Sequence, residues 1–213
     1  MAIAVDTTSH LYNSTGTSHS FSHTCTGSNL LLAVGIYVST NSDVVTSVTY
    51  NGVAMSRVTI QAGGTQTIYL YVLPNPSTGA NNVVISTSSS QTVYTDSVSY
   101  TGCAQSGQPN ANNAGRNPSA TSLTVSVTTT VDNCWLIGYY DSSDQSQTVG
   151  TNTFFRSGVN GFLGFIDSNG AQTPPGSKSM QITSAVNSEQ LMVIAAISPY
   201  STPSSGMMSF FMA

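Results

Sequence analysis

The scarcity of charged side chains is the feature that most restricts what this chain can fold into. Charged residues make up 6% of the 213 residues, against about 25% in an ordinary globular domain. Glu, Lys and Arg are among the good helix formers, and the sequence holds only one Glu, one Lys and three Arg. Thr, Val, Ile and Tyr are frequent instead, and these residues suit the pleated, half-buried surface of a sheet. The sequence therefore predicts an all-β fold.

The apolar residues are numerous enough to build a core. They make up 39% of the chain and are gathered into runs, whereas a disordered chain would be poorer in them. A sandwich of this length commonly stands as one unit. We therefore expect a single β-sandwich domain over residues 1–213.

Strand-like segments recur along the chain with turn residues between them. We expect strands at 3–5, 18–24, 30–38, 44–50, 53–60, 67–73, 83–87, 92–101, 123–127, 134–140, 153–156, 162–166, 179–183, 191–197 and 207–212. Asn51-Gly52 lies between two alternating segments and predicts a two-residue hairpin turn of type I′. Residues 102–120 show no periodicity, and we expect them to form a long loop that crosses over inside one sandwich.

Three apolar runs resemble one another, at 29–34, 133–138 and 190–195. Each begins with a polar residue and continues with almost uninterrupted apolar residues, a pattern typical of central strands buried on both faces. Their spacing along the chain is irregular, so no solenoid repeat is predicted.

The order of these segments resembles a jelly-roll-type β-sandwich domain. The resemblance is carried by Asn-Leu-Leu-Leu-Ala-Val-Gly at 29–35, Val-Thr-Ser-Val-Thr-Tyr-Asn-Gly-Val at 45–53, Ile-Tyr-Leu-Tyr-Val-Leu at 68–73, Val-Ser-Tyr-Thr-Gly at 98–102 and Leu-Thr-Val-Ser-Val-Thr-Thr-Thr at 123–130. That domain recurs in phage virion proteins, including capsid decoration and fibre proteins, and in bacterial surface proteins. The resemblance covers most of the chain and is strongest from Ser28 to Tyr140. It implies a two-sheet antiparallel sandwich and a role in display or adhesion, and it supplies no catalytic residue.

Charge argues against two classes of partner. The net charge is −4 and the four cationic residues are scattered, whereas phosphate contacts need clustered Lys and Arg. No apolar stretch reaches the 18 or more residues of a membrane-spanning helix. We therefore expect neither a nucleic acid nor a membrane as a partner.

The first residues carry no secretion signal. Met1–Asp6 lacks a basic segment followed by an apolar one. A hydroxyl-rich sandwich without such a signal favours a virion protein, which is assembled in the host cytoplasm and later faces the outside at the virion surface.

The three histidines offer little chemistry. His19 and His23 would share one face of a strand, but they would lie about 13 Å apart at a rise of about 3.3 Å per residue, too far to bind one metal ion. We interpret them and His10 as solvated or hydrogen-bonded surface residues.

The acidic residues are also few. Asp141 and Asp144 follow an apolar segment and are a weak calcium candidate, because Ca²⁺ prefers oxygen ligands from loops, although a plain polar turn explains them as well. A glycosidase would need two flanking carboxylates, which would have to come from Asp141, Asp144 and Asp167. The sequence has no Gly-x-Ser-x-Gly motif, and we expect no enzyme activity and no cofactor.

The cysteines are odd in number, which argues against a disulfide framework. Cys134 lies inside an apolar run and reads as a small buried hydrophobic residue. The sequence is also compatible with a single disulfide bond between Cys25 and Cys103.

Sugar binding would need exposed aromatic rings. The candidates for such a glycan platform are Tyr69, Tyr71, Tyr139 and Tyr140. The single tryptophan, Trp135, lies within a core run, where burial is expected.

The segment from Gly206 to Ala213 is unusually apolar for so polar a chain. Exposed to water, it would favour aggregation, so it is either a closing strand of the core or an arm buried against another subunit. Pro199 and Pro203 precede it and would let it reach a neighbour. Its candidate oligomer or lattice contacts are Met207, Met208, Phe210, Phe211 and Met212.

Together these features predict a virion structural protein. It would act as a capsid decoration or cement protein, or as a head-fibre or tail surface component, by self-assembly, most simply as a homotrimer, and by packing on a major capsid or other virion protein. One alternative is a carbohydrate-binding adhesin module of a phage or bacterial surface, which would bind a surface glycan. The other is a subunit of an extracellular filament, which would donate a terminal strand to its neighbour.

Overall fold

The computed structural model describes residues 1–159 and 161–201, and their regular structure is entirely β. The strands form two antiparallel sheets, one of seven strands from the first half of the chain and one of six from the second half. The first sheet holds β1 (Ala4–Cys25), β2 (Leu31–Val38), β3 (Val45–Tyr50), β4 (Val53–Ala54), β5 (Ser56–Ala62), β6 (Thr67–Pro74) and β7 (Gly79–Thr101). The second holds β8 (Ala111–Thr129), β9 (Trp135–Ser142), β10 (Thr148–Val149), β11 (Phe154–Val159), β12 (Leu163–Asp167) and β13 (Gly176–Ile197).

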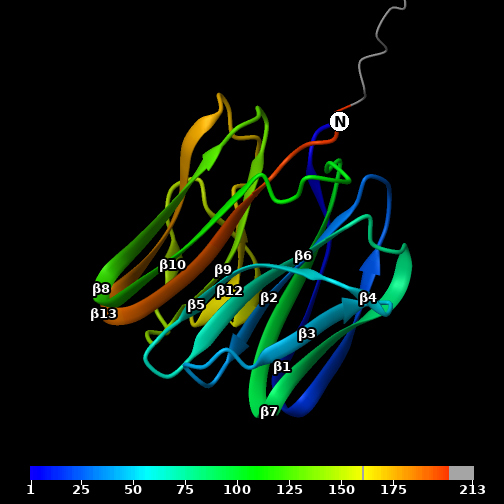
Figure 1. Cartoon of the computed structure of the whole chain (residues 1–213). Coiled ribbons are helices and arrows are strands. Elements are labelled where there is room, and N and C mark those ends of the chain that lie inside the picture. The colour runs from blue at the N-terminus through cyan, green and yellow to red at the C-terminus, as the bar shows by residue number, and fades with distance from the viewer. Residues whose placement is uncertain (160, 202–213) are drawn as a thin grey trace, which may run out of the picture.

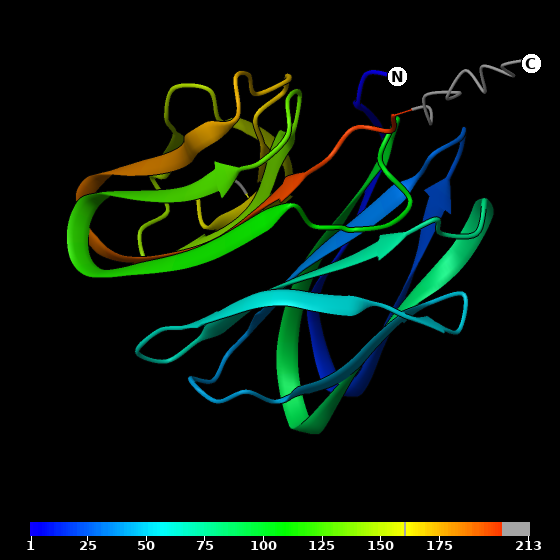
Figure 2. The same cartoon turned by 45° about the horizontal axis from the view of Figure 1, so that its top comes forward.

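Each sheet bends back over itself along its longest pair of strands. In the first half β1 pairs with β7 over most of their length, and the pairing shifts register between Gly16 and Ser18. In the second half β8 pairs with β13, with register shifts between Thr183 and Gln190. Such irregularities bend and twist a sheet. Figures 1 and 2 show both long strand pairs curving back at the ends of the two halves.

The bends divide the interior into three apolar clusters. One lies between the two sheets and includes Leu31 of β2 and Ile137 of β9. A second lies inside the bend of the first sheet, where Leu32 packs with residues of β1, β3 and β7. A third lies inside the bend of the second sheet, around Leu136. Strands β2 and β9 therefore have a core on each face, which explains their nearly uninterrupted apolar sequences.

The two halves have the same topology. In the first, β7 pairs with β1, β2 and β3, while β6 pairs with β2 and β5. In the second, β13 pairs with β8, β9 and β10, while β12 pairs with β9 and β11. Only the two-residue β4 lacks a counterpart among the described strands. The chain thus contains an internal duplication, and the sheets of its two halves pack face to face.

The duplication extends to the register of single residues. Cys25 pairs with Gly79 in the first half, and Thr129 pairs with Gly176 in the second. The segment Ser-His-Ser-Phe-Ser-His-Thr-Cys at 18–25 aligns without a gap with Ser-Leu-Thr-Val-Ser-Val-Thr-Thr at 122–129. Four positions on, Asn29 and Asn133 both adopt positive φ, at 52° and 60°. The first two of the three similar apolar runs are therefore equivalent, and the third is part of β13.

The predicted all-β, two-sheet antiparallel sandwich is confirmed. The finer jelly-roll assignment stays a prediction, as does the single domain over 1–213. The hairpin at Asn51-Gly52 has positive φ at both residues, as type I′ requires. The strand expected after it at 53–60 is wrong as one unit, because it divides into β4 and β5 on either side of buried Met55.

The long loop expected at 102–120 is also wrong in its second part. Residues from Ala111 onward form the first half of β8 and pair with β13. They show no apolar periodicity because β8 pairs only with β13 among the described strands and so lies at an edge. Backbone pairing holds an edge strand without burying its side chains. Pro118 lies where the pairing with β13 shifts register, a place where a strand tolerates proline.

Candidate functional site

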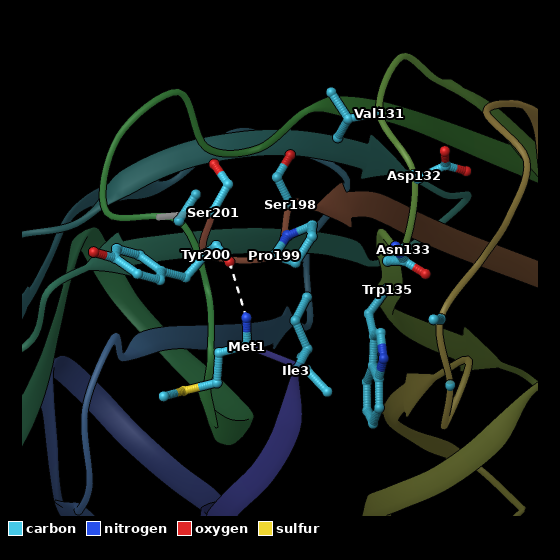
Figure 3. Close-up of a pocket in the computed structure, with 14 residues that line it drawn as sticks. Met1, Ile3, Val131, Asp132, Asn133, Trp135, Ser198, Pro199, Tyr200 and Ser201 are labelled. Carbon is cyan, nitrogen blue, oxygen red and sulfur yellow. Dashed lines mark hydrogen bonds between the residues drawn. The ribbon is translucent and has the colours of Figure 1, made fainter. Parts of the chain in front are cut away.

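A hollow of about 900 Å³ opens at the seam where the two halves meet. Its lining comes from five separate segments: the residues before β1, the loop after β7, the turn between β8 and β9 with the start of β9, the loop after β12, and the chain leaving β13. Ile3 and Trp135 are nearly buried in its wall, while Val131 is 41% exposed. In the view of Figure 3, Met1, Ile3 and Trp135 lie on one side, and Val131, Ser198 and Ser201 on the other. We call this hollow the seam pocket.

Backbone contacts between the ends of the two halves hold the pocket in shape. Cys103 and Pro199 form an isolated antiparallel bridge. The amide of Tyr200 donates to the carbonyl of Gly102 at 2.7 Å. The amino group of Met1 donates to the carbonyl of Tyr200 at 3.2 Å, as the dashed line in Figure 3 shows. The beginning and the end of the described chain are therefore neighbours at the pocket (Figure 1).

The turn between β8 and β9 places the pocket's largest side chain. Asn133 turns the chain with its positive φ, a conformation that asparagine tolerates better than most residues. Trp135 follows at the start of β9 and packs edge to face on Tyr100, with ring centroids 5.9 Å apart. The pocket wall is mainly apolar, with Asp132, Asn133 and two serines as its polar parts, and it suits apolar side chains more than charged groups.

A buried carboxylate of the first half is bound across the seam. Asp96 of β7 is fully buried and accepts hydrogen bonds from Tyr12, Ser157 and Tyr139, the last two from the second half. Burial raises the pKa of Asp96, and the hydrogen bonds from these hydroxyls act in the opposite direction.

A buried carboxylate of the second half accepts a hydrogen bond from the first half in the same way. Asp167 of β12 pairs with Arg156 at 2.6 Å and accepts a hydrogen bond of 3.0 Å from Tyr100 of β7. Each half thus supplies a buried aspartate that accepts a tyrosine hydroxyl from the other half. These contacts fix how the two halves dock, and the sequence contained no spacing signal that would have located them.

A third polar contact crosses the seam at the hairpin between β5 and β6. The side-chain amide of Gln66 donates to Asp141 at 3.0 Å and to Glu189 at 3.1 Å. Glu189 also pairs with Arg116 at 2.6 Å. Burial raises the pKa of Asp141 to about 7, and the charge of Glu189 acts in the same direction.

The structure separates the two calcium candidates. Asp141 is 2% exposed and bonds to Gln66 across the seam, while Asp144 folds back onto Ser146 in the following loop. We therefore withdraw Asp141 and Asp144 as a shared calcium site, because their oxygens serve different parts of the structure. Over residues 1–159 and 161–201, no group of three or more His, Cys, Asp or Glu side chains is arranged to hold a metal ion.

The predicted glycan platform is wrong for the tyrosines named. Tyr69, Tyr71, Tyr139 and Tyr140 are each at most 5% exposed, because the apolar runs that carry them are buried on both faces. Among the Phe, Tyr and Trp side chains of residues 1–159 and 161–201, the exposed ones are instead Phe154 and Phe155 at the start of β11, 45% and 39% exposed. Neighbouring residues of a strand point to opposite faces, so these two rings do not form one stacking surface.

The interpretation of the histidines as surface residues is wrong for two of the three. His19 and His23 are each 1% exposed and alternate with Phe21 and Cys25 on the inner face of β1. His23 bonds through Nδ1 to the hydroxyls of Ser97 and Ser9, at 2.9 and 3.1 Å. Burial lowers the pKa of His23 to about 4, against a weaker opposite effect of the Asp6 carboxylate.

All three cysteines are free and buried. Cys134 has the buried position expected of it. Cys25 and Cys103 are not bridged in this structure, since Cys25 lies inside the first half and Cys103 lies in the cluster between the sheets.

The predicted oligomer contacts lie outside the described residues. These are Met207, Met208, Phe210, Phe211 and Met212, a few positions beyond Ser201, which lines the seam pocket. Sequence reasoning missed the pocket itself, because its wall comes from segments far apart in the chain.

Comparisons with protein-family models, with curated proteins and with solved structures found no match to this chain. In the described part of the chain, no helix is long and apolar enough to cross a membrane.

Proposed function

We propose that this chain is a structural protein of a virus particle, as a capsid decoration or cement protein or a head-fibre or tail surface component. It acts by self-assembly, as a homotrimer, and by packing on a major capsid or other virion protein at the virion surface. The observation that carries the proposal is the seam pocket. It is a mainly apolar surface left open at the point from which the chain continues toward the apolar segment 206–213.

The chemistry of the surface supports the same proposal. With charged residues at 6% of the chain, contacts between copies depend little on Coulomb attraction and therefore tolerate changes in salt. The buried Asp96 and Asp167 hold the two halves together, which provides a firm unit for a lattice. The resemblance to jelly-roll domains of virion proteins points in the same direction.

The test is the solution mass of the purified chain by multi-angle light scattering over a range of concentrations and at two salt concentrations. We expect a trimer whose mass is the same at both salt concentrations. A monomer at all concentrations would overturn the proposal of self-assembly. An open-ended distribution of masses would instead support the filament subunit, because head-to-tail contacts that do not close into a ring form filaments.

A further inference from the structure

The seam pocket has the properties of a receptor for apolar side chains. Its volume of about 900 Å³ lies in the range of pockets that enclose a whole ligand, about 300–1,000 Å³. Its wall includes the nearly buried Ile3 and Trp135 and the exposed Val131. A concave pocket with a mainly apolar wall and a few polar groups is the usual form of a binding site.

The same chain contains a segment that fits such a receptor. Residues 206–213 hold five large apolar side chains, two Phe and three Met, and no charged one. In an extended strand they would alternate, with Met208, Phe210 and Met212 on one face and Met207 and Phe211 on the other. Because both faces are apolar, a single open pocket covers only one of them, and the other needs a second protein surface.

The connection from the pocket to this segment is short. Ser201 lines the pocket, and four residues, Thr202 to Ser205, separate it from Gly206. Four residues span at most about 14 Å when extended, so the connection is a short one. Short connections favour the exchange of an element between copies.

We propose that the seam pocket binds the segment 206–213 of a second copy of this chain. This inference rests on the proposed function and names the contact by which the copies assemble. One face of the segment fills the pocket of the neighbour, and the other is covered where the two copies meet. When each copy donates to the next, three copies close a ring.

The test uses two variants that each lack one half of the contact. A chain without residues 206–213 keeps the pocket and loses the segment. Val131→Asp keeps the segment and places a carboxylate in the pocket wall, at a position exposed enough to leave the fold intact. Val186→Asp is the matched control, because Val186 is 56% exposed and does not line the pocket.

Light scattering distinguishes the outcomes. We expect the truncated chain and Val131→Asp to be monomeric, with self-association weakened roughly tenfold or more, or about 1.4 kcal/mol, and Val186→Asp to assemble like the parent chain. An equimolar mixture of the truncated chain and Val131→Asp should form a one-to-one complex, because each supplies what the other lacks. If the parent chain assembles but the mixture stays monomeric, the inference is wrong while self-assembly stands. If the parent chain is itself monomeric, the proposed function fails.

Trp135 provides a second readout that does not depend on mass. It is the one tryptophan of the sequence and it lines the pocket, so its fluorescence reports occupancy. A synthetic peptide of residues 202–213, with added lysines for solubility, should shift the emission of the truncated chain to shorter wavelength with saturation. The same titration of the truncated chain carrying Val131→Asp should show weaker binding. Equal titrations of both chains would overturn the pocket as the receptor.

Discussion

At the scale of single residues, the close packing between the halves rests on one missing side chain. Gly35 of β2 faces Tyr139 of β9, and a Cβ atom at Gly35 would lie 2.2–2.8 Å from atoms of the tyrosine side chain. The ring cannot easily move, since Tyr139 is fully buried and its hydroxyl bonds to Asp96.

We expect Gly35→Ala to destabilise the protein by about 1–3 kcal/mol or more, because overpacking a dense core forces side chains or backbone to shift. Gly170→Ala is the control, because a Cβ there meets only one atom at 4.0 Å and should change the free energy of unfolding by less than about 0.5 kcal/mol. Urea unfolding followed by tryptophan fluorescence measures both. Equal effects of the two substitutions would show that the halves do not pack as closely as described.

Buried Asp141, which lies at the contact between the two halves, makes the free energy of unfolding depend on pH. Its pKa is about 7 in the folded protein, raised from 3.8 mainly by burial. A carboxyl with a raised folded pKa contributes stability below the unfolded pKa and loses that contribution as the pH rises through the folded value. The loss therefore develops between about pH 4 and pH 7 and is complete above pH 7.

We therefore expect Asp141→Asn to stabilise the protein by roughly 1–3 kcal/mol at pH 8 and to have little effect at pH 4. The asparagine oxygen still accepts the hydrogen bond from Gln66. Urea unfolding at pH 4, 6 and 8 measures the difference, with Asp144→Asn in the neighbouring loop as the control. An effect of Asp141→Asn that is the same at all three pH values would contradict the burial of an ionisable carboxyl at this position.

At the scale of elements, the tight hairpin turn could be predicted from the local sequence. The β3–β4 hairpin follows directly from Asn51-Gly52, whose φ values of 50° and 77° match the turn that this dipeptide favours. The long strands were harder, because β1 was expected as two separate strands and part of β8 as a loop. Their polar stretches form strands through pairing with β7 and β13, which lie far away in the sequence.

We expect Gly52→Ala to cost about 1–2 kcal/mol, since an L residue is strained at positive φ. No atom lies within 4 Å of a Cβ built at this position, so the cost is purely conformational. Ser47→Ala, at an exposed position of β3, should have little effect. If denaturant titration found the two equal, the hairpin would not have the described turn.

At the scale of the whole molecule, the duplication raises the question of whether the halves unfold separately. They share an apolar cluster and exchange hydrogen bonds between Asp96 and Tyr139 and between Asp167 and Tyr100. Losing one half would expose the shared cluster and remove the tyrosine donor that each of these carboxylates receives from the other half, at a cost of about 1–3 kcal/mol for each hydrogen bond lost.

We therefore expect one cooperative thermal transition in differential scanning calorimetry. This measurement also tests the prediction of a single domain over residues 1–213. Two resolved transitions would mean that each half is a domain of its own.

The sequence by itself determined the fold class, the central strands and the tight turns, because these depend on local preferences: few helix formers, runs of apolar residues, and Asn-Gly at a hairpin. It also contained the duplication, visible in the match of residues 18–25 with 122–129, though only the pairing register made that match convincing. Tertiary structure alone decided the rest. The burial of His19, His23 and the four tyrosines, the partners of Asp96, Asp141 and Asp167, and the seam pocket all arise where two sheets meet. Such contacts join residues with no fixed separation along the chain, so periodicity and spacing carry no signal for them.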